Sequence, residues 1–251
     1  MRLLIANSNT SAAVTESVAA AGRAAASAGT EIVGANARFG PRIIGSRMEA
    51  AVATHGLIDM LAEDAVGMDG VLIGMSLDAG LMAAREMLGM PVLGMTEAAM
   101  MTACMVAPRF GLLVMGRQGV VTGREVVEAY GLERRLAGIR MIEATPQDIL
   151  AAPEAFHAPL AEAANALVQE DGADAVVLMG AVLAIMPPVL RERVAVPVLE
   201  GIACGVPLLE ALVRMGIRAP TAGSLRTPLG RETIGLGAAL AARLSRTTKA
   251  P

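Results

Sequence analysis

The sequence predicts an α/β fold of two pseudo-symmetric domains, each a parallel sheet flanked by helices, with the site in the cleft between them. Two repeats support this prediction. The segment from Asp69 to Met75 resembles the segment from Asp174 to Gly180, 105 positions later. The segment from Pro91 to Gly94 resembles that from Pro197 to Glu200, 106 positions later. In addition, short apolar runs alternate with helical patterns along the chain, which is typical of parallel sheets with right-handed crossovers.

Each element is expected from its own local pattern. Strands are expected where short β-branched runs are bounded by turn residues: 2–6, 31–34, 70–74, 92–95, 112–115, 138–142, 175–179 and 198–200. Helices are expected where longer stretches between them carry apolar residues at helical spacing: 11–27, 48–63, 80–88, 97–106, 120–129, 153–169, 186–193 and 203–215.

The domain boundary is expected at Ala107-Pro108-Arg109, a short linker between the two repeats. The first domain then covers residues 1–107, and the second covers residues 108–215. A C-terminal helix at about 216–246, with its clearest pattern over 231–244, is expected to pack back on the first domain.

Composition narrows the function classes. The net charge is −3 and no block of lysine or arginine occurs, so nucleic acid is not an expected partner. The two cysteines lack a paired spacing, which favours a reducing, cytoplasmic compartment. The uncharged stretch from Ala175 to Leu190 is shorter than the roughly 20 residues of a spanning helix and contains two prolines, so no membrane is expected. The expected partner is a small molecule.

A polar loop follows the first predicted strand. Asn7, Asn9, Thr10 and Ser11 lie where the strand ends and the first helix begins. Free amide groups at a helix N-terminus attract anions, so the loop is expected to bind a carboxylate or an imide oxygen. The alternative is that these side chains only cap the helix.

The ends of the other strands supply further candidates for binding. Met75 and Ser76 end the first copy of the repeat, and Gly180 and Ala181 end the second, so they are expected to face each other across the cleft. Three residues that follow the predicted strands 92–95 and 112–115 are further binding candidates: Thr96, Gly116 and Arg117.

Four side chains are candidates for proton transfer. Asp78 is either a general base or the cap of the helix that starts near Gly80. Glu97 and Glu200 end strands among apolar neighbours, where burial would raise their pKa; the alternative is a first-turn position favoured by the helix dipole. Cys204 lies near a helix start that can lower its pKa, whereas Cys104 is expected to be an inert core thiol.

Several motifs together resemble the Asp/Glu/hydantoin racemase family. They are Asn7-Ser8-Asn9-Thr10-Ser11, Asp78-Ala79-Gly80-Leu81, Pro91 to Ala98 and Gly172 to Leu178. The resemblance covers about residues 2–215 and implies two pseudo-symmetric α/β domains with a small-molecule site between them, in a homo-oligomer. It also implies a cofactor-independent racemase, isomerase or decarboxylase that handles a carbanion next to a carbonyl, with no metal.

The chain departs from the family pattern at its catalytic centre. Family racemases use one cysteine from each half, and the matching positions here are Met75 and Gly180, which cannot transfer a proton. Met115-Gly116 also replaces the usual threonine pair. An isomerase would therefore need Asp78, Glu97, Glu200 or Cys204 as acid or base. Asn9, Thr10 and Ser76 would then hold the enolate oxygen.

Two other functions are compatible with these residues. One is a lyase, decarboxylase or hydrolase that acts on a small carboxylate or cyclic amide. The other is a non-catalytic accessory protein that binds the ligand. The fold alone does not choose among the three.

Overall fold

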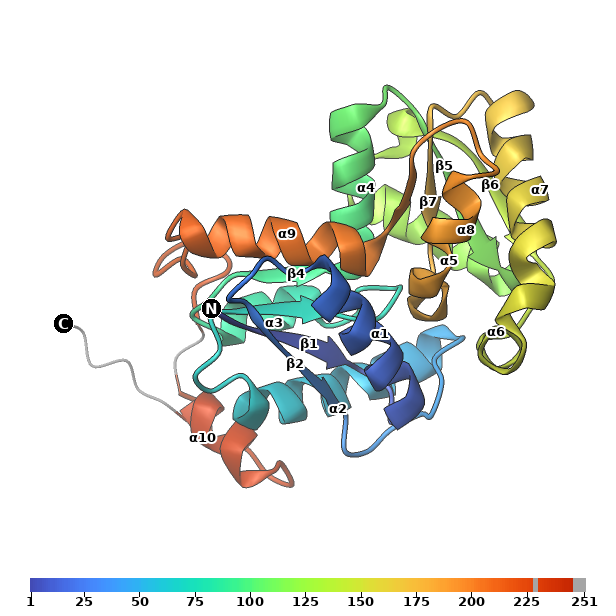
Figure 1. Cartoon of the computed structure of the whole chain (residues 1–251). Helices are drawn as coiled ribbons and strands as arrows, with labels where there is room; N and C mark the ends of the chain where they lie inside the picture. Colours follow the sequence, from blue (N-terminus) through green and yellow to red (C-terminus); the bar gives the residue numbers. More distant parts are fainter. Residues whose placement is uncertain (228–229, 246–251) are drawn as a thin grey trace.

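The chain forms two four-stranded parallel sheets of the same topology (Figure 1). The structure is a computed structural model that describes residues 1–227 and 230–245. The strand order is β2-β1-β3-β4 in the first sheet and β6-β5-β7-β8 in the second. The strands are β1 (Arg2–Asn7), β2 (Glu31–Asn36), β3 (Gly70–Ile73), β4 (Val92–Gly94), β5 (Phe110–Met115), β6 (Leu136–Ile142), β7 (Ala175–Leu178) and β8 (Val198–Glu200). The predicted fold class is confirmed.

Helices cover both faces of each sheet. They are α1 (Ala12–Ala25), α2 (Arg47–Asp64), α3 (Leu81–Met87), α4 (Met95–Val106), α5 (Gly116–Ala129), α6 (Pro146–Ala151), α7 (His157–Gln169), α8 (Pro187–Arg191), α9 (Gly201–Arg214) and α10 (Ala238–Ser245). Short 3-10 turns are η1 (Glu133–Arg135), η2 (Pro153–Phe156) and η3 (Ala181–Ile185). Because both faces are covered, the central strands are continuous apolar runs, and Val71, Leu72 and Ile73 are fully buried.

The two halves exchange one helix each. Helix α4 follows the first sheet but packs on the second, where Ala99 and Met100 join Val114 and Val177 in one core cluster. Helix α9 follows the second sheet but packs on the first (Figure 1). A Cβ atom at Gly205 of α9 would lie 2.6 Å from a methyl carbon of Leu72, so this helix needs glycine at its contact with β3.

The C-terminal helix is shorter than the predicted helix at about 216–246. Helix α10 covers only Ala238–Ser245, and position 246 lies outside the described residues. The described residues between α9 and α10 do not form a helix, because Pro220 and the left-handed glycines Gly216, Gly223 and Gly235 interrupt the chain. Helix α10 packs against α2, and the Arg243 Nε atom donates to the Ala62 carbonyl at 3.1 Å.

The predicted helix over 153–169 is also corrected. It divides into η2 and α7 at Phe156, whose backbone (φ −101°, ψ −2°) departs from α-helical values. The domain boundaries at 107 and 215 stay a prediction about folding units. Within the described ranges, no helix is long and apolar enough to cross a membrane.

Candidate active site

The carboxyl ends of both sheets meet at two neighbouring cavities. The smaller cavity has a volume of about 80 Å³ and the larger cavity about 230 Å³. Both are lined by the same five residues: Ile44, Met75, Ser76, Met115 and Pro146. Met75 follows β3 and Met115 ends β5, so the cavities lie where an open parallel sheet places its ligands.

The rest of the lining is apolar or neutral. The smaller cavity adds Asn9, Val14, Ile43, Gly74, Ala181 and Val182. The larger cavity adds Gly45, Leu77, Val114, Gln118, Gly119, Thr122, Ala144, Thr145 and Met179. Among the described residues, neither cavity is lined by an acid, a base or a thiol. The walls can therefore bind a neutral ligand through amide and hydroxyl groups, but they hold no proton carrier.

The polar loop after β1 is bonded mostly within itself. The Asn9 Oδ1 atom accepts from the Asn7 amide at 2.9 Å and from the Ser11 N–H at 2.8 Å. Ser11 caps α1 by accepting from the Val14 N–H. The Thr10 hydroxyl donates to the Pro41 carbonyl at 3.4 Å. Of this loop only Asn9 lines a cavity, so helix capping accounts for most of the polar side chains.

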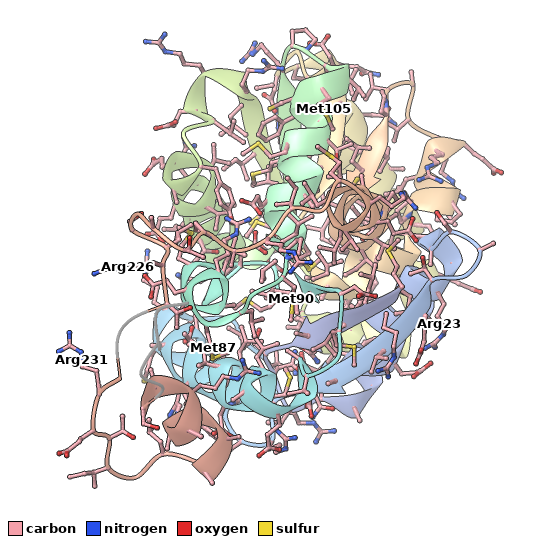
Figure 2. All side chains as sticks on the ribbon, turned by 90° about the vertical axis from the view of Figure 1, so that its left-hand side faces the viewer. Arg23, Met87, Met90, Met105, Arg226 and Arg231 are labelled. Carbon is pink, nitrogen blue, oxygen red and sulfur yellow. The ribbon has the colours of Figure 1, made fainter. Side chains whose placement is uncertain are left out.

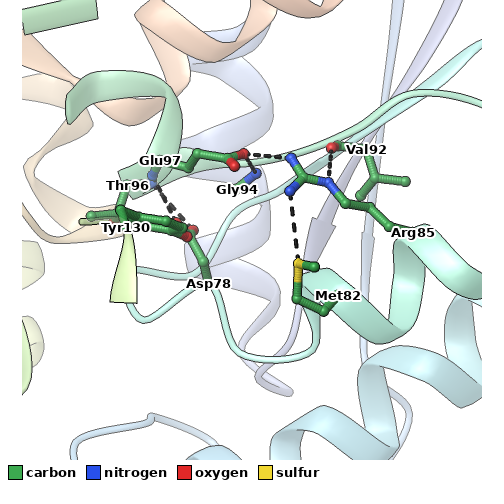
Figure 3. A network of polar contacts seen from close by, with 8 residues as sticks. All are labelled: Asp78, Met82, Arg85, Val92, Gly94, Thr96, Glu97 and Tyr130. Atoms are coloured by element: carbon green, nitrogen blue, oxygen red, sulfur yellow. Dashed lines mark hydrogen bonds and ion pairs between the residues drawn. The ribbon is translucent and has the colours of Figure 1, made fainter. Parts of the chain in front are cut away.

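Asp78 lies behind the cavity wall and caps a different helix from the one expected. Its carboxylate accepts from the N–H groups of Thr96 at 3.2 Å and Glu97 at 2.7 Å, in the first turn of α4 (Figure 3). It also accepts from the Tyr130 hydroxyl at 2.7 Å. Helix α3, which Asp78 was expected to cap, has Gly80 at its N-cap position and no side-chain cap. Burial raises the pKa of Asp78 to about 7, against the opposing effect of these hydrogen bonds.

Glu97 takes part in an ion pair. Its carboxylate lies 2.7 Å from Arg85 Nη2, and the Arg85 Nε atom donates to the Val92 carbonyl at 3.0 Å (Figure 3). Arg85 and Glu97 line a separate cavity of about 430 Å³ together with Asp78 and Tyr130, which we name the charged pocket. Leu77 lines both the charged pocket and the larger cavity, and so forms the wall between them.

Glu200 is the counterpart of Asp78 in the second half. Its carboxylate accepts from the N–H groups of Ile202 and Ala203, at the start of α9. These positions match Thr96 and Glu97 in the repeat. Burial raises the pKa of Glu200 to about 7, in the direction expected from the sequence.

Gly94 stands at the N-cap of α4 and has no side chain, so the cap of this helix comes from Asp78 instead. Gly94 matches Glu200 in the repeat, and a Cβ atom there would lie 2.3 Å from the Asp78 carboxyl carbon. The Asp78 carboxyl group thus occupies the space that the side chain of residue 94 would need. Both carboxylates stabilise the start of a helix, which is a structural reason for burying them.

The expectation that the pKa of Cys204 is lowered is wrong. Burial raises the pKa of this thiol to about 11, which outweighs a hydrogen bond with Thr102. The thiol is therefore protonated at neutral pH, and it lies at the contact of α9 with α4. Cys104 is partly buried beside a core cluster, as expected of a structural thiol.

The remaining predicted residues divide into two groups. Met75 and Ser76 line both cavities, and Ala181 lines the smaller one. Four others line neither cavity: Thr96, Gly116, Arg117 and Gly180. The buried Thr96 hydroxyl donates to the Ser76 carbonyl at 2.6 Å, so it positions the loop that carries Ser76. Arg117 is exposed and makes no contribution to the wall.

Sequence reasoning missed several lining residues. Gln118 and Thr122 are four positions apart and therefore share one face of α5. Ile43 and Ile44 form an apolar pair in a loop bounded by proline and glycine. Both patterns are visible in the sequence. Tyr130 carries no comparable pattern, because its partner Asp78 is 52 positions away.

The fold and site define a two-half α/β protein with a neutral ligand cavity between the sheet ends. A sequence model of the family described as Asp/Glu/Hydantoin racemase matches residues 3–209, and the chain belongs to this family.

Three similar proteins extend this finding. A hydantoin racemase from Paenarthrobacter aurescens is 32% identical over 92% of this chain and 99% of its own length. The solved structure of an allantoin racemase from Klebsiella pneumoniae has a TM-score of 0.88 and 32% identity, covering 96% of this chain and 98% of that one. The solved structure of an allantoin racemase from Pseudomonas fluorescens has a TM-score of 0.90 and 29% identity, covering 94% of this chain and 100% of that one.

Proposed function

We propose that this protein is a racemase-like isomerase that moves a proton on the carbon next to a carbonyl of a small, uncharged cyclic amide. The observation that carries the proposal is the lining of the two cavities, where Asn9, Ser76, Gln118, Thr122 and Thr145 offer neutral donors and acceptors. Amino-acid substrates would bring a carboxylate into a wall without a cation, at a large desolvation cost. The names of the relatives, hydantoin and allantoin racemase, agree with a cyclic amide.

The proton carrier is proposed to be Asp78. Of the four candidates it is the one in the segment that forms the cavity wall, one position after Leu77. A carboxyl group whose pKa is about 7 can both accept and donate a proton at neutral pH. Glu97 is a weaker candidate because its carboxylate is held in an ion pair with Arg85, and Cys204 is weaker because burial raises the pKa of its thiol. Glu200 caps a helix as Asp78 does, but neither it nor an adjacent residue lines either cavity.

A second candidate function is ligand binding without chemistry. It is favoured by the absence of an acid or base from both cavity walls among the described residues. A cytoplasmic location and assembly into a homo-oligomer stay predictions under either function.

The test is proton NMR of 5-methylhydantoin, 5-benzylhydantoin, allantoin, aspartate and glutamate in D₂O with the purified protein. We expect loss of the α-proton signal of a cyclic amide above the rate without protein, and none with the two amino acids. Binding without exchange would favour the second function, and new product signals would favour a lyase or hydrolase. Asp78→Asn should abolish exchange, whereas the matched control Asp174→Asn should leave it unchanged, because Asp174 is exposed before the start of β7, at the end of the sheet opposite the cavities.

A further inference from the structure

Each of the two cavities is smaller than an ordinary small-molecule site. Ordinary small-molecule sites have volumes of about 300–1,000 Å³, and the smaller and larger cavities have about 80 and 230 Å³. Their neutral polar groups are also divided, with Asn9 in the smaller cavity and Gln118, Thr122 and Thr145 in the larger. A ligand that uses both sets must cross the boundary between them.

Five residues line both cavities, and two of them are methionines, one from each half. Met75 and Met115 line both cavities. On the second half, Met179 lines the larger cavity and Ala181 the smaller, so the boundary passes over Gly180. A Cβ atom at Gly180 would lie 2.7 Å from the Met115 methyl carbon, which shows that this methyl group covers Gly180.

The two methionines differ in how firmly they are held. The Met75 sulfur accepts a hydrogen bond from the Leu77 N–H at 3.1 Å, and its side chain is buried. Met115 is partly exposed at the end of β5. A methionine side chain has three rotatable bonds and adapts to irregular space. Of the two methionines, Met115 is therefore the one whose side chain can change rotamer and open the boundary.

We infer that Met75 and Met115 divide a single ligand site, and that Met115 sets the size of the substituent the ligand can carry. The ring of the ligand lies on one side of the boundary, and its apolar substituent enters the other side when Met115 moves. This rests on the proposed function only in naming a cyclic amide as the ligand.

The test compares the affinities of 5-benzylhydantoin and 5-methylhydantoin for the native protein and for Met115→Ala. We expect the preference for the benzyl ligand to rise at least about tenfold, the scale on which small changes of pocket volume discriminate ligands. The matched control is Met105→Ala. Met105 lies at the end of α4, away from the site and 67% exposed, and its loss should not change the preference (Figure 2). An unchanged preference in Met115→Ala would overturn the inference.

A second measurement follows the boundary directly. With ¹³C-labelled methionine methyl groups, 5-benzylhydantoin should shift the signals of Met75 and Met115 but not that of Met105. Binding that leaves both boundary signals in place would overturn the inference. If Met115→Ala does not fold, Met115→Leu keeps the volume but stiffens the side chain, and it should weaken benzyl binding selectively. Equal weakening of both ligands would count against the inference.

Indole separates this inference from the proposed function, because it is uncharged and bicyclic and is not a cyclic amide. If no hydantoin binds but indole binds Met115→Ala more tightly than the native protein, the boundary stands and the proposed function fails. If hydantoins exchange their α-protons while neither the ligand preference nor indole binding responds to Met115→Ala, the proposed function stands and the boundary fails.

Discussion

At the scale of single residues, Asp78 and Glu200 do the same work from different places in the two halves. Each carboxylate accepts from two N–H groups in the first turn of a long helix. Asp78 also joins the halves, because the Tyr130 hydroxyl that donates to it belongs to the second half. A backbone φ of +47° at Asp78, unusual for a residue other than glycine, is the conformational cost of this placement.

Asp78→Ala should lower the free energy of unfolding by about 1–3 kcal/mol, because it leaves two helix amides and the Tyr130 hydroxyl without their acceptor. Urea unfolding measures the change. Thr145→Ala removes an exposed cap from α6 and should cost at most about 1 kcal/mol. If Asp78→Ala is as stable as the native protein, the capping role is wrong.

Gly94→Ala should be strongly destabilising, by about 1–3 kcal/mol or more, because its Cβ atom would collide with the Asp78 carboxyl group. Gly89→Ala is the matched control. No atom lies within 4 Å of the Cβ position there, so the change should stay within about 0.5 kcal/mol. Thermal melts measure the stability of the two variants. Equal melting midpoints would contradict the predicted collision at residue 94.

At the scale of elements, the strands and most helices could be predicted because each has a local pattern. The run from Gly70 to Ile73 is apolar and bounded by turn residues, whatever packs on it. The site was predicted less well. Met75 and Ser76 follow from the strand ends, but the cap that Asp78 provides depends on the missing side chain of Gly94, a contact in space that no spacing encodes.

The carboxyl groups that cap α4 and α9 should make the stability of the protein depend on pH. Free aspartate and glutamate side chains release their protons near pH 4, whereas the pKa values of Asp78 and Glu200 are raised to about 7. Between these values the folded state binds more protons than the unfolded state. The free energy of unfolding should therefore fall as the pH rises from about 5 to about 7.

The expected fall is at least about 1.4 kcal/mol, the value of one pKa unit. Urea unfolding at half-unit pH steps measures it. Carboxylates whose pKa is lowered, such as Asp148 and Asp171, titrate below this window and do not mask the effect. The double variant Asp78→Asn, Glu200→Gln should flatten the curve, and an unchanged slope would contradict the assignment.

At the scale of the whole molecule, the exchange of α4 and α9 decides how the halves depend on each other. Each sheet has one face covered partly by a helix that the other half supplies. The repeat could not reveal this, because α4 and α9 are equivalent in sequence and either pairing satisfies the same offset. The two predicted domains are therefore not expected to be independent folding units.

A fragment of residues 1–107 should not fold alone, since it lacks α9, whose Ile202, Val206 and Leu209 pack with Leu3, Ile5 and Leu72. The intact chain should unfold in one calorimetric transition, with equal calorimetric and van't Hoff enthalpies. Circular dichroism and calorimetry are the measurements. A folded fragment, or two separate transitions in the intact chain, would support the boundary at residue 107 instead.

The exchanged helix also has a consequence for the order of synthesis. On the ribosome, β4 is complete at Gly94, but the helix that covers its sheet is not finished until Arg214. At roughly 5–20 residues per second, an apolar sheet face waits about 6–24 seconds for its cover. During that interval the nascent chain presents Leu3, Ile5 and Leu72 as a surface for chaperones or for other nascent chains.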